Sequence, residues 1–118
     1  MLNLNHKKPE VWKLSVDLIK LTYKTTENFP GSELFGVTNQ LRRASVSIAS
    51  ILAEGCARKS LLERKRFFEI SRSSLAEVDT QLEISRELNF ISESAIVKFD
   101  QLLNILFAKL SNLIMKAN

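Results

Sequence analysis

A chain of 118 residues is long enough for one domain with its own hydrophobic core, and a single cysteine and a single histidine exclude an intrachain disulfide and a zinc-ligand set. Only three glycines and two prolines occur, and no apolar run approaches the roughly 20 residues of a membrane span, so the composition favours a helical protein away from membranes. The first ten residues lack the apolar core of a signal peptide, which predicts a cytoplasmic location, and the net charge of +4 is compatible with an anionic partner.

Apolar residues recur three and four apart in four successive segments, the spacing that places them on one face of a helix. The first helix is expected to begin at Pro9, whose ring presets a helical φ, and to end before Phe29-Pro30. The second reaches Gly55, which we interpret as a C-terminal cap. The predicted helices cover residues 9–28, 37–55, 61–88 and 93–116.

The ends of the third and fourth helices carry further signals. Ser60 and Glu63 are typical of a capping box, and Asn89 tolerates the left-handed conformation that ends a helix. Ser92 is the expected N-cap of the last helix. Because short connections make neighbouring helices antiparallel, we predict an all-α, antiparallel up-down four-helix bundle in a single domain of residues 1–118.

Small side chains line a second face of the second predicted helix. Ser45, Ala49 and Ala53 lie four residues apart, which predicts close approach of another helix backbone. The third helix offers matching serines at Ser71, Ser73 and Ser74. We expect tight packing of the second and third helices, and the alternative is that part of this face meets another subunit.

Apolar residues also lie off the main stripes, more of them than a monomeric bundle usually needs. They are Trp12, Ile19, Phe67, Ile70, Ile84, Leu102, Ile105 and Ile114. One interpretation is that some are buried between subunits of a homo-oligomer. The other is that the buried stripes are simply broad.

Positive charge is concentrated in residues 42–72. The basic residues there are Arg42, Arg43, Arg58, Lys59, Arg64, Lys65, Arg66 and Arg72. One hypothesis is a phosphate-binding surface for RNA or DNA, weakened where Glu63 and Glu69 pair with Arg66 and Arg72 three residues on. The other is that the bundle is a scaffold or adaptor for a protein partner, and that these charges form a solvated face. Arg64 occupies an otherwise apolar stripe position, so its stem is expected along the edge of the core.

No group of residues predicts a catalytic site, a metal site or a cofactor. His6 lies in a polar segment, and the spacing of the sequence gives Cys56 no histidine partner. Glu54 ends an apolar helix, where a carboxylate gains nothing from the helix dipole. We expect a structural salt bridge from Glu54 to Arg43 or Arg58, with a ligand-binding carboxylate as the alternative.

The segment from Gln40 to Ser60 resembles the 23S rRNA intervening-sequence proteins, and the likeness extends over most of the chain. The residues that carry the resemblance are Trp12, Phe29-Pro30, Glu33, Gly36, Gln40, Arg43, Ser47, Ser50, Ala53-Glu54-Gly55, Arg58-Lys59-Ser60, Phe67-Phe68-Glu69-Ile70, Ser74-Leu75, Glu77 and Gln81-Leu82-Glu83. The sequence departs from the family pattern at Ala49 and Ile51, where relatives usually have proline and asparagine.

The resemblance implies a bacterial four-helix bundle that assembles into a ring-like homopentamer and is encoded, in some bacteria, within inserts in rRNA genes. It also implies kinship with the accessory variability proteins of diversity-generating retroelements, which form basic pentamers that partner a reverse transcriptase and nucleic acid. The function expected is therefore a non-enzymatic oligomer that binds nucleic acid, with the protein scaffold as the alternative.

Overall fold

The computed structural model describes residues 1–4 and 10–117, and helices are the regular secondary structure found there. In chain order these are α1 (Glu10–Thr26), the short 3-10 helix η2 (Gly31–Glu33), α2 (Val37–Cys56), α3 (Leu61–Glu87) and α4 (Glu93–Lys116). The prediction of an all-α protein with four α-helices is confirmed. Pro9 and His6 lie outside the described residues.

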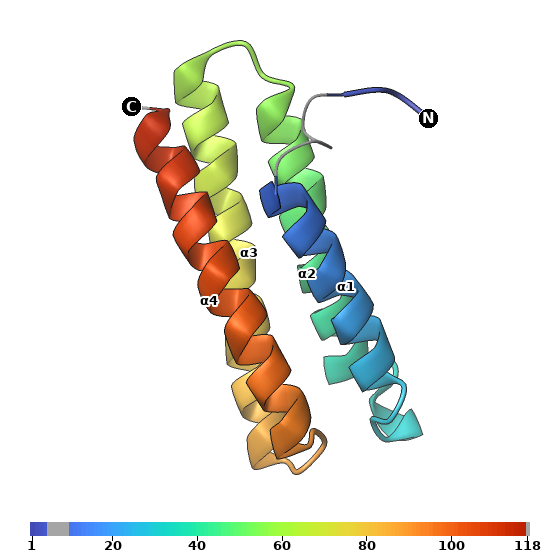
Figure 1. The fold of residues 1–118 in the computed structure, drawn as a ribbon. Helices are drawn as coiled ribbons and strands as arrows, with labels where there is room; N and C mark the ends of the chain where they lie inside the picture. The colour runs from blue at the N-terminus through green and yellow to red at the C-terminus, as the bar shows by residue number, and fades with distance from the viewer. Residues whose placement is uncertain (5–9, 118) are drawn as a thin grey trace.

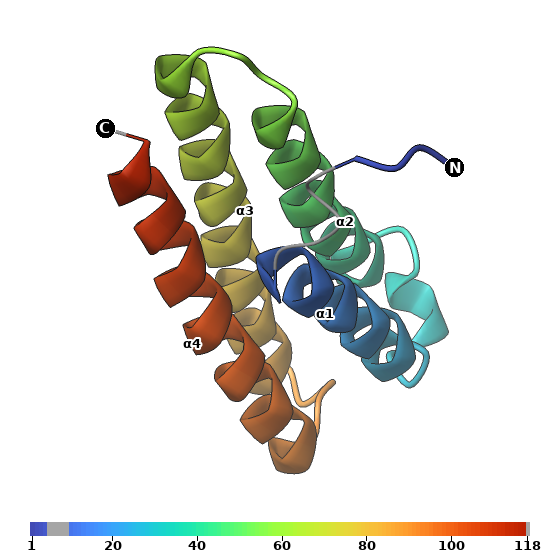
Figure 2. The ribbon, with the colours of Figure 1, turned by 45° about the horizontal axis from the view of Figure 1, so that its top comes forward.

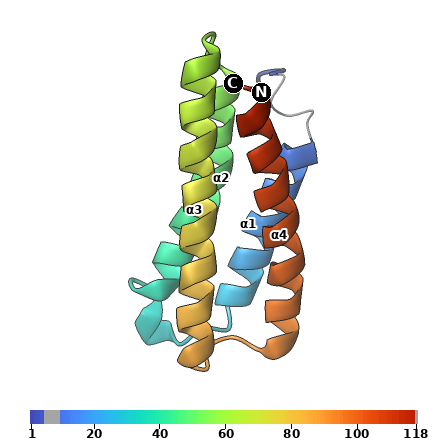
Figure 3. The same ribbon diagram turned by 90° about the vertical axis from the view of Figure 1, so that its left-hand side faces the viewer.

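The helices lie side by side in a body of 43 × 28 × 20 Å. The connection between α2 and α3 lies at one end of the body, and the α1–α2 and α3–α4 connections lie at the other (Figure 1). Each helix packs against two others, α1 and α3 both contacting α2 and α4 (Figure 2). Viewed from the side, α2 lies behind α3 and α1 lies behind α4 (Figure 3).

The predicted ends of the third and fourth helices are confirmed. The Ser60 hydroxyl accepts the backbone N–H of Glu63 at 3.1 Å, and the Ser92 hydroxyl accepts that of Ala95 at 3.2 Å. Asn89, with a φ of 61°, adopts the left-handed conformation just after α3. The two serines bond backbone N–H groups that the start of a helix leaves unpaired, and the left-handed conformation of Asn89 ends α3.

The apolar stripes form the core as predicted, because each helix contributes a completely buried side chain. Leu18, Ile48, Val78 and Leu106 are each 0% exposed. Leu61 begins the apolar stripe of the third predicted helix, but it is the first residue of α3 and remains exposed. At the end opposite the α2–α3 connection, the rings of Phe29 and Phe90 lie with centroids 5.8 Å apart and tie the two loops together.

The contact between α2 and α3 runs through small and polar residues in three layers. Gly55 lies against Phe67, the Ser47 and Ser74 hydroxyls are 3.1 Å apart, and the Gln81 amide donates to Gln40 at 3.3 Å. Residue numbers fall along α2 while they rise along α3, so these two helices run in opposite directions. A fourth contact joins side chain to backbone, the Ser71 hydroxyl donating to the carbonyl of Ile48 at 2.8 Å.

Two predictions about α2 are wrong. Gly55 is not a C-terminal cap, because α2 continues to Cys56 and Gly55 has no positive φ. Ala53 does not face α3 either: at about 100° per residue it lies about 160° around the helix from Gly55. It shares the side of Arg42, which contacts α1 through Thr26. The residue that permits close packing on α3 is therefore Gly55.

Replacing Gly55 with alanine should destabilise the protein. The added Cβ would stand 2.9 Å from Phe67 Cβ and 2.9 Å from Phe68 Cε1, closer than carbon atoms pack. Overpacking costs about 1–3 kcal/mol, which outweighs the ~1 kcal/mol that alanine gains in helix propensity. Urea unfolding followed by circular dichroism measures the difference.

Gly31→Ala is the matched control, because nothing lies within 4 Å of a Cβ at that position. Its free energy of unfolding should stay within about 0.5 kcal/mol of the unmodified protein. Equal stability of the two variants would show that α2 and α3 can separate without cost at Gly55.

Candidate nucleic-acid interface

The eight basic residues of segment 42–72 do not form one surface. Arg42 and Arg43 lie near the start of α2, while Arg58 follows its end. At about 1.5 Å per residue, Arg43 and Arg58 are separated by about 20 Å along the helix axis. They therefore lie toward opposite ends of the body, as the course of α2 in Figure 1 shows.

Two of the predicted phosphate-binding arginines are used instead to join helices. Arg42 lies with its guanidinium carbon 4.7 Å from the centre of the Tyr23 ring on α1, and its Nε donates to the Thr26 hydroxyl at 2.9 Å. Arg72 lies 5.4 Å from the ring centre of Phe107 on α4 and donates to the Ser111 hydroxyl at 2.9 Å. Both guanidinium groups are partly buried between neighbouring helices.

A third arginine stacks at the α2–α3 connection. The guanidinium carbon of Arg58 lies 4.7 Å from the Phe67 ring centre, and the Arg58 carbonyl accepts a hydrogen bond from Arg64 Nε. Arg64 is half-buried, in agreement with the prediction that its stem follows the edge of the core. Together, Arg58 and Arg64 fix the loop between the two helices.

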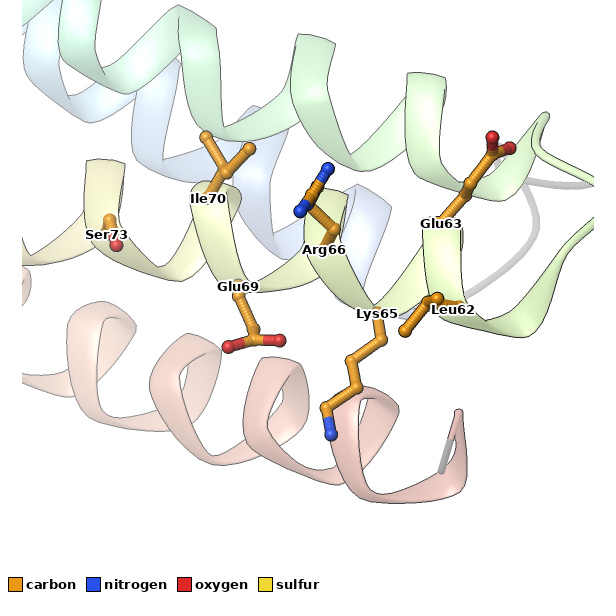
Figure 4. Close-up of a pocket in the computed structure, with 7 residues that line it drawn as sticks. All are labelled: Leu62, Glu63, Lys65, Arg66, Glu69, Ile70 and Ser73. Carbon is orange, nitrogen blue, oxygen red and sulfur yellow. The ribbon is translucent and has the colours of Figure 1, made fainter.

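Three further basic residues, Lys59, Lys65 and Arg66, lie at that same end. We name the α2–α3 end cluster as the set Arg58, Lys59, Arg64, Lys65 and Arg66, which is accompanied in residues 58–66 by one acidic residue, Glu63. Lys65 points toward α4 and Arg66 points to the opposite side, toward α2 (Figure 4). The C-terminal end of α4, with Lys116 as its last residue, lies at the same end of the body (Figure 1).

A shallow depression of about 790 Å³ lies along the outward side of α3 beside the cluster. Its lining residues are Leu62, Glu63, Lys65, Arg66, Glu69, Ile70 and Ser73 (Figure 4). Leu62 is 77% exposed, so the charged groups stand among accessible apolar surface.

Within the described ranges, neither Arg58 nor Arg66 forms an ion pair with a glutamate. The ion pairs found there are Arg86–Glu93 at 3.0 Å and Lys109–Glu10 at 3.1 Å. Glu93 raises the pKa of Arg86 through its hydrogen bond and its negative charge. The predicted salt bridge from Glu54 to Arg43 or Arg58 is not formed in this part of the chain. Glu54 is exposed, and the Arg58 side chain lies on Phe67 instead.

Cys56 is half-buried beside the cluster. Burial raises the pKa of its thiol, and the charge of Arg64, which acts in the opposite direction, is the smaller effect. The thiol is therefore largely protonated at neutral pH, and a protonated thiol is a weak nucleophile. Residues 1–4 and 10–117 bring no three His, Cys, Asp or Glu side chains together in a geometry for a metal ion.

A second concave site, missed from the sequence, lies between α2 and α3 near the other end. We name it the Phe35 groove: it has a volume of about 450 Å³ and is lined by Phe35, Asn39, Gln40, Arg43, Ala44, Ser47 and Glu77. Phe35 precedes α2 and is 92% exposed. Of the predicted basic residues, Arg43 alone lines this groove.

A buried amide underlies the Phe35 groove. Gln81 is 7% exposed, and its Nε2 donates to Gln40 Oε1 and to Glu77 Oε1, each at 3.3 Å. Its own Oε1 is buried and accepts no hydrogen bond from the described residues, a situation that costs about 1–3 kcal/mol. Gln81 therefore orients two groove residues at the expense of stability. Sequence spacing could not reveal this, because Gln40 and Gln81 meet only in the folded chain.

These features define a small all-α protein of four helices with an exposed basic end. The chain matches the family model described as 23S rRNA-intervening sequence protein over residues 7–112, and it belongs to that family. No curated protein matches it. Among the described helices, none has the length and apolar character needed to cross a membrane.

Arg72→Ala should lower the free energy of unfolding by about 1–2 kcal/mol, because it removes a charged hydrogen bond to Ser111 and the packing on Phe107. Arg66→Ala, on the same helix but exposed, should change it by less than about 0.5 kcal/mol. Thermal unfolding of both variants measures the contrast. Equal effects would remove the distinction between arginines that join helices and arginines of the end cluster.

Proposed function

We propose that this family member is a non-enzymatic cytoplasmic protein that binds RNA or DNA through the α2–α3 end cluster. The observation that carries the proposal is the concentration of five basic residues against one glutamate in residues 58–66. Arg66 is exposed and keeps its charge unpaired by glutamate in the described residues, so it is available to phosphates.

The proposed interface is smaller than the eight residues named from the sequence. Arg42 and Arg72 are withdrawn from it because their guanidinium groups join helices. Lys59 and Arg66 are exposed and are the side chains best placed to contact phosphates. Arg43 belongs to the Phe35 groove, at a distance from the cluster.

We further propose that the chain forms an antiparallel up-down bundle that assembles as a homopentamer, as its resemblance to the 23S rRNA intervening-sequence proteins, with their kinship to the accessory variability proteins, also implies. Support comes from off-stripe apolar residues: Ile70, Ile84 and Ile105 are exposed, although Ile114 is buried within the chain. A ring would repeat the end cluster in every subunit. Linked copies raise the effective concentration of binding sites and offset the modest charge of one chain.

A scaffold for a protein partner is the second candidate. The observation that favours it is the exposed apolar surface at the start of α3, where Leu61 and Leu62 flank the end cluster. Contiguous exposed apolar side chains are typical of protein–protein contact sites. A protein partner would bind there through burial of apolar area, with weak dependence on salt.

The proposed assembly predicts a molar mass about five times that of the 13.4 kDa chain. Light scattering coupled to size-exclusion chromatography at micromolar concentration measures it. A single species with the mass of one chain would remove both the ring and the multivalent binding argument.

The proposed function predicts binding that depends steeply on salt. The logarithm of the affinity for single-stranded RNA should fall with the logarithm of salt concentration by about 0.7 for each phosphate neutralised. In Lys59→Ala/Arg66→Ala the slope should be shallower by about 1.4 for each cluster that contacts the strand. Fluorescence anisotropy with a labelled oligonucleotide measures both slopes.

Lys20→Ala/Lys24→Ala is the matched control. It removes the same charge from exposed positions on α1, outside the end cluster, and should leave most of the slope in place. Both variants must keep the unfolding midpoint and mass of the unmodified protein. If the unmodified protein does not bind RNA or DNA at about 50 mM salt, the nucleic-acid proposal fails and the protein scaffold becomes the leading candidate.

A further inference from the structure

We propose that the Phe35 groove binds one unpaired guanine of a single-stranded nucleic acid. This inference rests on the proposed nucleic-acid-binding function and assigns base recognition to a site separate from the end cluster. The groove brings together an aromatic ring, two side-chain amides, an arginine and a carboxylate in about 450 Å³. Stacking, base-edge hydrogen bonds and a phosphate contact are the three elements by which proteins recognise single strands.

Phe35 supplies the stacking surface. Its ring is 92% exposed at the rim of the groove, although the buried Phe29 a few residues earlier shows that this loop can place a ring in the core. An exposed phenyl ring is available to stack on a base, because every base has a flat π-face. A role in base stacking explains why the Phe35 ring stands exposed at the rim of a polar groove.

Gln40 and Glu77 supply the hydrogen-bonding edge. The buried Gln81 amide occupies Gln40 Oε1 and Glu77 Oε1. In the described residues this leaves the Gln40 amide N–H groups and Glu77 Oε2 without hydrogen bonds, so the groove presents donors beside an acceptor. Because both side chains are bonded to one buried nitrogen, the donors and the acceptor are held close together.

Guanine matches this arrangement better than the other bases. Its Watson–Crick edge has a carbonyl acceptor followed by two N–H donors. The carbonyl suits the Gln40 amide, and the two donors suit the Glu77 carboxylate, because each carboxylate oxygen has two lone pairs and Oε1 can accept a second hydrogen bond beside that from Gln81. Adenine and cytosine each offer one amino donor beside a ring nitrogen acceptor, so each presents one donor to the carboxylate where guanine presents two. Uracil places a carbonyl on both sides of its one N–H, and one of these would face the carboxylate.

Arg43 and the outward side of α3 connect the groove to the rest of a bound strand. Arg43 is exposed at the groove and makes no hydrogen bond or ion pair with a described residue, so its charge is available to a phosphate. On α3, Arg66, Ile70, Ser73 and Glu77 follow one another at spacings of three and four, which places them on one face. A strand seated on the end cluster therefore reaches the groove along a single helix face.

The test uses labelled oligouridine of about ten residues, with the central base left as uracil or changed to guanine, adenine or cytosine. At one fixed low salt concentration, the guanine-containing strand should bind about tenfold more tightly than oligouridine. Phe35→Ala should remove this gain. With the fluorescent base 2-aminopurine at the central position, stacking on Phe35 of the unmodified protein should quench the fluorescence, and Phe35→Ala should abolish this quenching. Leu34→Ala is the matched control, because Leu34 is an exposed neighbour that does not line the groove. This variant should keep the gain from guanine and the fluorescence quenching.

Glu77→Gln tests the hydrogen-bonding edge without changing its shape. The glutamine carbonyl can still accept from Gln81, but a donor now replaces the acceptor that faces the base. The guanine preference should disappear while binding of oligouridine is retained.

Three results would overturn the inference. Oligouridine binding with no gain from guanine would refute the groove and leave the end-cluster function intact. Absence of binding by every strand would refute both. A lower molar mass of Phe35→Ala in light scattering would show that the groove holds a second copy of the chain instead of a base.

Discussion

The close approach of α2 and α3 is the constraint on which the Phe35 groove and the α2–α3 connection depend. At one end, Gly55 leaves room for Phe67, and at the middle the Ser71 hydroxyl reaches the backbone carbonyl of Ile48. A larger residue at Gly55 would push the helices apart where the end cluster begins. Toward the other end the same seam closes on Gln40 and Gln81, which shape the Phe35 groove. Packing along one helix pair thus sets the geometry of the groove and of the connection from which the end cluster begins.

Arginine has two different physical roles in this protein. Arg42, Arg58 and Arg72 lie over the rings of Tyr23, Phe67 and Phe107, and the guanidinium groups of Arg42 and Arg72 also donate directed hydrogen bonds. Each contact joins neighbouring helices or the loop between them. Positive charge in the sequence therefore overstates the charge that is free for a partner, and the accessible remainder is concentrated at one end of the body.

The sequence predicted what local rules determine and missed what only tertiary contacts determine. Stripes such as that of Leu18 and the caps at Ser60 and Ser92 follow from spacing within one helix, and the structure confirms them. Gly55 was misread because a glycine near a helix end resembles a cap, whereas its role depends on Phe67, a residue of the next helix.

The same limit applies to the candidate sites. A run of basic residues is visible in the sequence, but whether Arg72 faces solvent or Phe107 is decided by α4. The Phe35 groove combines residues from two helices and a turn, so no local spacing marks it. One heptad does relate to it: Phe67, Ser74 and Gln81 are seven apart, and each contacts α2.

The geometry of α3 separates stability from binding. Ser71, Leu75 and Val78 point into the core, while Arg66, Ser73 and Glu77 lie on the opposite face. Because the inward residues fix the helix against its neighbours, the outward residues keep a constant spacing without contributing much to folding. Substitutions on the outward face can therefore test the proposed binding roles while the fold persists. Gln81 is the exception, since it lies between the two faces and couples the orientation of Glu77 to the packing of α2 on α3.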